Sequence, residues 1–169
     1  MGIIFITGPK GAGKSTLVRK AMEKIRPDSP AGLFTTRKAD SGEVIITDFH
    51  FTREALIGKL VEGKGMVPCP EGFSGLGIEV LDSVTGSDFL VIDELGFLEN
   101  AVPCFRYAVF KALEKVQSGL VVLKQAETAF LNALKTFPGS RVFAVSRENR
   151  DELLDKLLEE ADVDRSAGE

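Results

Sequence analysis

Short apolar runs alternate with longer amphipathic stretches along this chain. Residues 2–7 carry four consecutive apolar side chains, and between residues 14 and 26 the apolar positions recur every three or four residues. The first pattern is typical of a buried strand and the second of an amphipathic helix, which Pro27 ends. Strands that alternate with helices usually form a parallel sheet, so the pattern predicts an α/β fold.

The same alternation continues towards the end of the chain. Buried strands are predicted at 88–93, 120–123 and 141–145, separated by helices at 101–117 and 126–136. A last helix follows, and its start is predicted from the capping-box spacing of Asn149 and Glu152. The inner face of that helix would consist of Leu153, Leu154, Leu157 and Leu158.

The middle of the chain departs from this alternation. Residues 32–37 and 43–49 have the pattern of two strands joined by the turn at 40–42, which predicts an antiparallel hairpin at an edge of the sheet. A short helix is predicted around 53–63, and the stretch 63–77, rich in glycine and proline, is predicted to be a loop. The buried positions of that helix would be Leu56, Ile57, Leu60 and Val61.

Length and composition narrow the class of protein. The 169 residues suit one domain, predicted to span residues 1–161, followed by a frayed tail at 162–169. The apolar runs are too short for a signal peptide or a bilayer-spanning helix, so we expect a cytoplasmic protein that binds no membrane. The two cysteines lack the spacing of a zinc or redox site, and a single histidine excludes a multi-histidine metal site.

The charge is distributed unevenly along the chain. The formal net charge is −4, which disfavours nucleic acid as a partner, because proteins that bind its backbone are usually basic. Residues 151–169 hold eight acidic and two basic side chains, whereas residues 1–26 hold six basic and one acidic. The net charge therefore does not argue against a nucleotide bound near the first helix.

The turn between the first strand and the first helix contains a complete phosphate-binding loop, or P-loop. Residues 8–15 read GPKGAGKS, which fits the pattern GxxxxGK[ST]. Its glycines allow successive backbone N–H groups to point at phosphate oxygens, and the positive end of the helix faces the same anion. Lys14 is predicted to reach the β- and γ-phosphates, and Ser15 to ligate magnesium (Mg2+). The predicted nucleotide contacts are Gly8, Pro9, Lys10, Gly11, Ala12, Gly13, Lys14, Ser15 and Thr16.

A carboxylate pair follows the predicted strand at 88–93. Asp93 comes after four apolar residues, where P-loop enzymes place the acid that holds the metal, so it is the second predicted magnesium ligand. Glu94 is predicted to face the γ-phosphate and polarise the attacking water, which makes Glu94 and Lys14 the predicted catalytic residues. Candidates for an additional positive charge at the transition state are Arg37, Arg147 and Arg150.

These motifs resemble a known family. The P-loop, VIDELGFLE at 91–99 and ENRD at 148–151 are similar in type and order to the small nucleoside-triphosphatases that include the cancer-related nucleoside-triphosphatase and its thermophilic prokaryotic relatives. The resemblance implies a three-layer, RecA-like P-loop NTPase fold, in which helices cover both faces of a mainly parallel sheet with a small antiparallel edge. It also implies magnesium-dependent hydrolysis of several nucleoside triphosphates. The chain departs from the family pattern at Lys10, in the region 63–81, and at Lys124-Gln125, which replaces a usual His-Arg pair.

Two other functions would use the same phosphate-binding loop. A small-molecule or nucleotide kinase needs an arginine-rich lid, and residues 124–141 contain a single arginine, Arg141. A slow nucleotide-dependent switch needs a base-reading NKxD motif, and only the partner motif DxxG is present, at 93–96. The leading hypothesis is an NTPase that cleaves the β–γ bond of ATP or GTP with magnesium. The sequence leaves the preferred base, the oligomeric state and any protein partner open.

Overall fold

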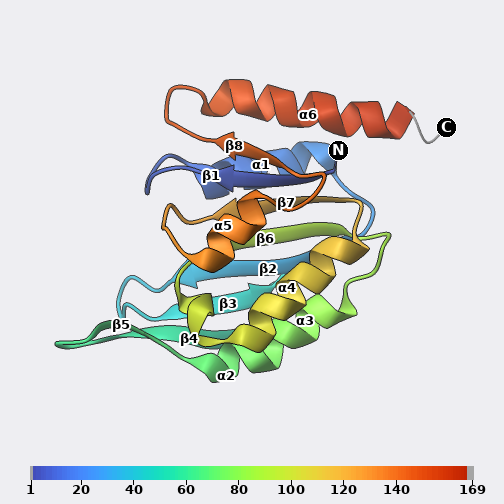
Figure 1. The fold of residues 1–169 in the computed structure, drawn as a ribbon. Coiled ribbons are helices and arrows are strands. Elements are labelled where there is room, and N and C mark those ends of the chain that lie inside the picture. Colours follow the sequence, from blue (N-terminus) through green and yellow to red (C-terminus); the bar gives the residue numbers. More distant parts are fainter. Residues whose placement is uncertain (1, 167–169) are drawn as a thin grey trace.

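A mixed sheet of eight strands forms the centre of the molecule in the computed structural model, which describes residues 2–166 and the side chains of residues 2–160 (Figure 1). The order across the sheet is β5-β4-β3-β2-β6-β7-β1-β8. The parallel strands are β1 (Ile3–Thr7), β2 (Pro30–Arg37), β6 (Phe89–Leu95), β7 (Ser118–Leu123) and β8 (Arg141–Ala144). The antiparallel edge consists of β3 (Val44–Asp48), β4 (Glu54–Val61) and β5 (Gly65–Pro68). The predicted sheet, mainly parallel with a small antiparallel edge, is confirmed.

Helices cover both faces of this sheet and complete three layers (Figure 1). The helices α1 (Lys14–Ile25) and α6 (Arg150–Ser166) pack on one face. The other face is covered by α3 (Ile78–Ser83), α4 (Pro103–Lys115) and α5 (Ala129–Lys135). Shorter segments are α2 (Pro70–Gly72), the π-helical turn η1 (Phe73–Gly77) and the 3-10 turn η2 (Leu98–Ala101).

Each face of the sheet has its own apolar core, because the strands are buried on both sides. In β1, Phe5 packs in the core under α4 and α5, whereas Ile4 and Ile6 pack in the core under α1 and α6. The predicted inner faces of α1 and α6 are confirmed, and Leu17 and Leu157 are both fully buried. The two cores hold the carboxyl ends of the parallel strands rigidly at one edge of the sheet, where α/β proteins bind their ligands.

The helix predicted around 53–63 is wrong, because these residues form strand β4. Strand β4 pairs with β3 on one side and with β5 on the other, and it turns Ile57 into the core. The apolar spacing at 56, 57, 60 and 61 also fits a helix, but pairing on both sides satisfies the backbone of this segment as a strand.

The loop predicted at 63–77 is also wrong, because it contains β5, α2 and η1. Two helices are shorter than predicted, since α4 begins at Pro103 and α5 at Ala129. Proline suits the first turn of a helix, and the Thr128 hydroxyl caps α5 by accepting a hydrogen bond from Leu131 N at 3.1 Å.

The capping box predicted for Asn149 and Glu152 does not form. Asn149 Oδ1 accepts a hydrogen bond from Ser146 N at 2.7 Å, and its Nδ2 donates to Ala144 O at 3.0 Å. The side chain therefore closes the turn after β8 instead of capping α6. Of the residues predicted to be a frayed tail, 162–166 belong to α6, and 167–169 lie outside the described residues.

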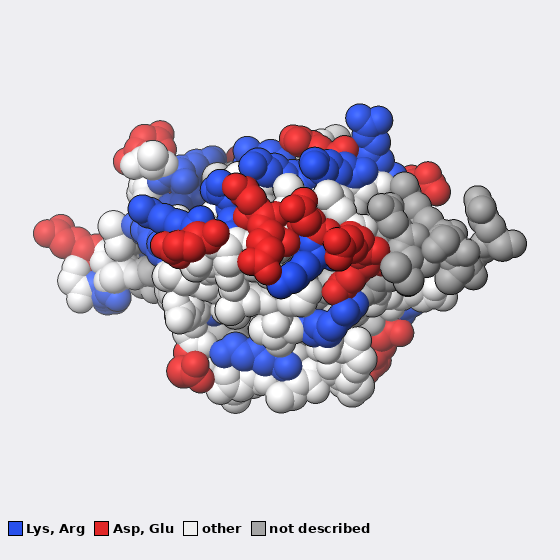
Figure 2. Space-filling model, turned by 90° about the horizontal axis from the view of Figure 1, so that it is seen from above, with Lys and Arg blue, Asp and Glu red and all other residues white. Residues whose placement is uncertain are grey.

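The face seen from above α6 carries acidic side chains across its middle, with lysine and arginine side chains around them (Figure 2). This arrangement agrees with the acidic composition of residues 151–169. Among the helices in the described part of the chain, none combines the length and the apolar character that crossing a membrane requires.

Candidate active site

The P-loop connects β1 to α1 through a backbone that glycine makes possible. Gly8 has φ 150° and Gly13 has φ 92°, both in the range that side chains disfavour. A Cβ atom at Gly8 would lie 2.3 Å from Val145 O, and one at Gly13 would lie 2.9 Å from Arg150 Cδ. The loop therefore depends on glycine for its dihedral angles and for its close contact with the segment after β8.

Lys14 is the first residue of α1, and its side chain folds back over the loop. Its Nζ donates hydrogen bonds to Gly8 O at 2.9 Å and to Pro9 O at 3.3 Å, and the residue is only 8% exposed. Glu94 Oε2 lies 3.6 Å from the same nitrogen. The predicted catalytic pair, Lys14 and Glu94, is thus brought into contact from two elements far apart in sequence.

Ser15 and Asp93 also meet, although 78 positions separate them. Ser15 Oγ donates a hydrogen bond to Asp93 Oδ1 at 3.2 Å, and Asp93 is 6% exposed. Burial raises the pKa of the Asp93 carboxyl to about 6, although the hydrogen bond from Ser15 lowers it.

These two side chains supply the kind of ligands that magnesium prefers. A hydroxyl and a carboxylate are hard oxygen donors, and Mg2+ is usually bound by one or two carboxylates together with water and substrate phosphates. Within the described residues, no group of three or more His, Cys, Asp and Glu could hold a metal ion by itself. The donor set therefore fits a magnesium ion that is shared with a phosphate ligand rather than held by a protein cage.

Glu94 stands at the carboxyl end of β6, next to Asp93. Its backbone carbonyl accepts a hydrogen bond from Thr35 Oγ1 on β2 at 3.2 Å, and its side chain is 29% exposed. The pairing of β6 with β7 shifts register between Asp93 and Leu95, and the Asp93–Glu94 peptide bond is cis. The Glu94 carboxylate lies beside Lys14 of the P-loop and lines a cavity.

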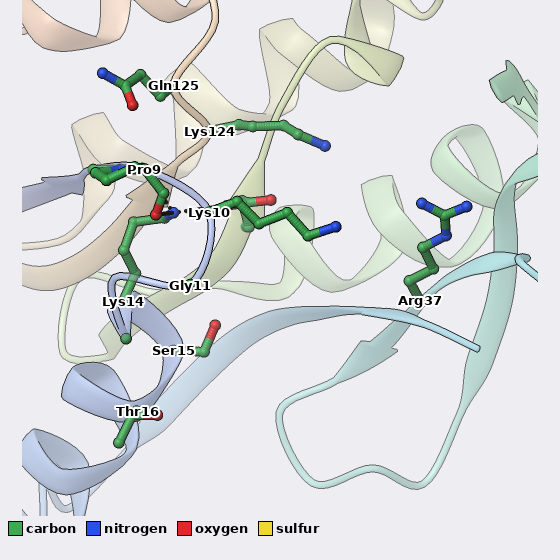
Figure 3. Close-up of a pocket in the computed structure, with 12 residues that line it drawn as sticks. Pro9, Lys10, Gly11, Lys14, Ser15, Thr16, Arg37, Lys124 and Gln125 are labelled. Carbon is green, nitrogen blue, oxygen red and sulfur yellow. Dashed lines mark hydrogen bonds and ion pairs between the residues drawn. The ribbon is translucent and has the colours of Figure 1, made fainter. Parts of the chain in front are cut away.

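This cavity, the P-loop pocket, has a volume of about 550 Å³. Lys10, Lys124 and Arg37 extend into the space between the P-loop and β2 (Figure 3). The pocket is lined by Gly8, Pro9, Lys10, Gly11, Gly13, Lys14, Ser15, Thr16, Arg37, Glu94, Lys124 and Gln125. Of the predicted nucleotide contacts only Ala12 does not line it, because its side chain is buried in the core under α1.

The three candidate arginines occupy different positions. Arg37, at the end of β2, lines the P-loop pocket, and within the described part of the chain its guanidinium has no hydrogen-bond or ion-pair partner. Arg147 Nε donates a long hydrogen bond of 3.5 Å to Gly11 O. Arg150 packs against Gly13, and its Nε lies 3.5 Å from Asp151. Only Arg37 therefore points a free guanidinium into the pocket from the side opposite the P-loop.

Three polar residues at the site, Lys124, Gln125 and Glu99, were not among the predicted site residues. Lys124 follows β7, the strand between β1 and β6, and its position at a parallel strand end is the signal that could have identified it. Glu99, 3% exposed, accepts a hydrogen bond from Gly96 N at 3.0 Å. Burial raises the pKa of Glu99 to about 7. Glu94 lies between the P-loop pocket and a second cavity of about 320 Å³ that Glu99 also lines.

Solved structures of two other proteins share this fold. A crystal structure of THEP1 from Aquifex aeolicus matches with a TM-score of 0.77 at 21% identity, over 92% of this chain and 96% of that one. The solution structure of a human cancer-related nucleoside triphosphatase matches with a TM-score of 0.75 at 24% identity, over 94% and 96%.

Sequence comparison extends this likeness to curated relatives. A nucleoside-triphosphatase THEP1 from Methanosarcina barkeri is 31% identical over 166 residues, which cover 91% of this chain and 94% of the relative. A cancer-related nucleoside-triphosphatase homolog from Bos taurus is 30% identical, and the match covers 92% of this chain and 94% of the relative. The family described as NTPase matches residues 3–158. This chain therefore belongs to the NTPase family of small P-loop proteins.

Proposed function

We propose that this protein hydrolyses the bond between the β- and γ-phosphates of nucleoside triphosphates such as ATP and GTP, with magnesium as cofactor. The observation that carries the proposal is the position of Glu94, which lines the P-loop pocket with its carboxylate 3.6 Å from Lys14 Nζ. Membership of the NTPase family, whose curated relatives are named nucleoside-triphosphatases, supports the same reaction.

Positive charge around the terminal phosphates would come from two directions. Lys14 carries an ammonium group that lines the pocket and is oriented by the carbonyl groups of Gly8 and Pro9. Arg37 approaches from β2 on the opposite side, and its guanidinium is free to bind phosphate oxygens. Negative charge that builds up on the γ-phosphoryl group during cleavage would be stabilised from both sides.

Ser15 and Asp93 would hold magnesium between the protein and the β- and γ-phosphates. Bound there, the ion would supply positive charge that neutralises the phosphate oxygens. Asp93 must lose its proton to serve as a ligand, and its raised pKa of about 6 is compatible with ionisation at neutral pH.

Glu94 would orient the attacking water and accept its proton. The water oxygen forms a bond to the γ-phosphorus, and the bond from that phosphorus to the β–γ bridging oxygen breaks. The products are a nucleoside diphosphate and inorganic phosphate. Thr35 anchors the backbone carbonyl of Glu94, and the carboxylate, 3.6 Å from Lys14 Nζ, is left to bind the water.

Phosphate release from ATP and from GTP tests this assignment with Lys14→Ala and Glu94→Gln. We expect both variants to lose kcat by about 100-fold or more, the typical effect of removing a general base or a phosphate-binding lysine. A nucleotide-binding titration separates the two roles, because Glu94→Gln should still bind ATP, whereas Lys14→Ala should bind it more weakly.

Matched controls come from the exposed turn between β4 and β5. Lys64→Ala and Glu62→Gln remove the same types of charge far from the P-loop and should leave phosphate release unchanged. Equal activity in the wild type and in both site variants would refute the proposed function. Phosphorylation of an added metabolite at the expense of phosphate release would instead favour the kinase.

A further inference from the structure

Another cavity beside the P-loop pocket lies between α1, strand β2 and the segment that follows β3. This cavity, the aromatic pocket, has a volume of about 520 Å³, within the range of natural small-molecule sites. It has an aromatic wall on one side and the polar face of α1 on the other. Its lining residues on β2 include Phe34 and Thr36, and those on the segment after β3 are Phe49 and Phe51.

Three phenylalanine rings form the aromatic wall. The Phe34 and Phe51 rings are stacked, with centroids 5.1 Å apart and planes inclined by 21°, and Phe49 contacts Phe34 at 5.6 Å. Phe51 is nevertheless 66% exposed. Phe34 therefore covers one face of this ring and leaves the other open, which makes Phe51 a platform on which a planar ring can stack.

Two guanidinium groups lie at the same pocket. Arg19 comes from α1 and Arg37 from the end of β2, and both line the cavity. Within the described part of the chain, neither makes a hydrogen bond or an ion pair, although the charge of Arg19 lowers the pKa of Asp93. Two unpaired arginines beside an aromatic platform suit a ligand that combines a planar ring with an anionic group. Glu23 and Asp93, which also line the pocket, limit how much negative charge it accepts.

The aromatic pocket adjoins the phosphate site on its metal-binding side. Ser15 and Asp93, the proposed magnesium ligands, line it, whereas Thr16 and the P-loop glycines line only the P-loop pocket. Ser15 and Asp93 would hold magnesium near the terminal phosphates, whereas the base of the same nucleotide would extend from its α-phosphate. The pocket is therefore placed for a second molecule beside the terminal phosphates.

We propose that the aromatic pocket binds a second nucleotide, of the nucleoside monophosphate class. Its base stacks on Phe51, and its phosphate binds Arg19. Arg37 lines both pockets and lies between this phosphate and the terminal phosphates of the P-loop nucleotide. The placement of this ligand beside the γ-phosphate rests on the proposed function, whereas the binding itself does not.

Isothermal titration calorimetry with AMP and GMP tests the site, using protein saturated with magnesium and a non-hydrolysable ATP analogue. We expect the monophosphates to bind, adenosine and inorganic phosphate to bind at least tenfold more weakly, and Phe51→Ala and Arg19→Ala each to weaken AMP binding by about tenfold or more. Tyr107→Ala is the matched control, because Tyr107 is equally exposed, at 66%, but lies on α4. It should bind AMP as the wild type does.

Three outcomes would overturn the proposal. The first is that AMP fails to bind the wild type at millimolar concentration. The second is that Phe51→Ala binds AMP as tightly as Tyr107→Ala does. The third is that the ATP analogue displaces AMP and Phe51→Ala raises the KM for ATP, which would mean that the platform holds the base of the P-loop nucleotide. Calorimetry needs no turnover, so the two proposals can fail separately. Hydrolysis of ATP without AMP binding would refute only the second-nucleotide site. Binding of AMP without ATP hydrolysis would refute only the proposed NTPase function.

Discussion

Glu99 illustrates how burial controls a single ionisable group. Its carboxyl is 3% exposed and receives a hydrogen bond from Gly96 N, and Glu94 and Lys124 are the charged groups that act on it. Removal from water disfavours its charged form, and the negative charge of Glu94 acts in the same direction. Hydrogen bonds from the backbone of Glu99 and Gly96, and to a smaller extent the charge of Lys124, oppose both effects but do not cancel them, so the pKa rises from 4.5 to about 7.

This shift predicts a pH dependence of stability. Below pH 4.5 the carboxyl is protonated in the folded and the unfolded protein, and its neutral form is fully compatible with burial. As the pH rises from 4.5 to about 7, the Glu99 carboxyl ionises in the unfolded protein but not in the folded one. The unfolded state is thereby favoured, and the free energy of unfolding falls by up to about 3 kcal/mol.

Urea unfolding of the wild type and of Glu99→Gln at pH 5 and pH 8 measures this loss. Glutamine keeps an oxygen that can accept the hydrogen bond from Gly96 but does not ionise. From pH 5 to pH 8, we expect the free energy of unfolding of the variant to rise by about 2–3 kcal/mol relative to that of the wild type. A difference that does not depend on pH would show that Glu99 does not titrate in this range.

At the scale of single residues, the sequence predicted one part of the site and not the other. The P-loop, Asp93 and Glu94 could be found because each follows a strand whose apolar pattern is unmistakable. Arg37 could be named only as one candidate of three. Its selection depends on the path of β2 across the sheet, which places the end of that strand opposite the P-loop. Such a meeting of distant strand ends leaves no local pattern in a sequence.

Among the secondary-structure elements, β4 shows why periodicity alone misled the prediction. Its apolar residues come in two adjacent pairs, a spacing that a helix and a partly buried strand both satisfy. Strand pairing decided between them, and pairing depends on β3 and β5, which lie outside the segment itself. The strands β1, β6 and β7 were predictable because continuous apolar runs are typical of strands buried on both faces.

The contact between β2 and β6 depends on one glycine. Gly32 has φ 139°, and a Cβ atom there would lie 1.8 Å from Val91 O on the neighbouring strand. Gly32→Ala should therefore force the two strands apart and cost about 3 kcal/mol or more of unfolding free energy. Because β2 carries Arg37, this variant should also lose activity before it unfolds.

Gly63→Ala is the control for that substitution. Gly63 also has a positive φ, 72°, but a Cβ atom there would meet nothing within 4 Å. We expect it to cost only the backbone strain, about 1 kcal/mol. Thermal unfolding of both variants tests the comparison, and similar losses would mean that the close approach of β2 to β6 is not what Gly32 provides.

At the scale of the whole molecule, two cores share one sheet. Val18 on α1 and Val109 on α4 are fully buried on opposite faces, with the sheet between them. Replacing either by alanine should cost about 2 kcal/mol, from lost burial and the cavity left behind. Because the two sites share no neighbours across the sheet, the double variant should lose the sum, about 4 kcal/mol.

Urea unfolding followed by far-ultraviolet circular dichroism measures these losses. We expect one cooperative transition in all three variants, since β1, β2, β6 and β7 each place side chains against both cores. Two separate transitions in the double variant would show that the two faces unfold independently. A loss in the double variant that differs by more than about 1 kcal/mol from the sum of the two single losses would contradict the expected additivity.

The outermost strands of the sheet, β5 and β8, have only four residues each. Pro68 ends β5 and has no N–H group to donate to another strand, and β8 begins with a charged residue, Arg141. Short edges of this kind give a strand from a second molecule almost no length along which to add. A protein whose central strands are this apolar is thereby kept from growing into fibrils through its own sheet.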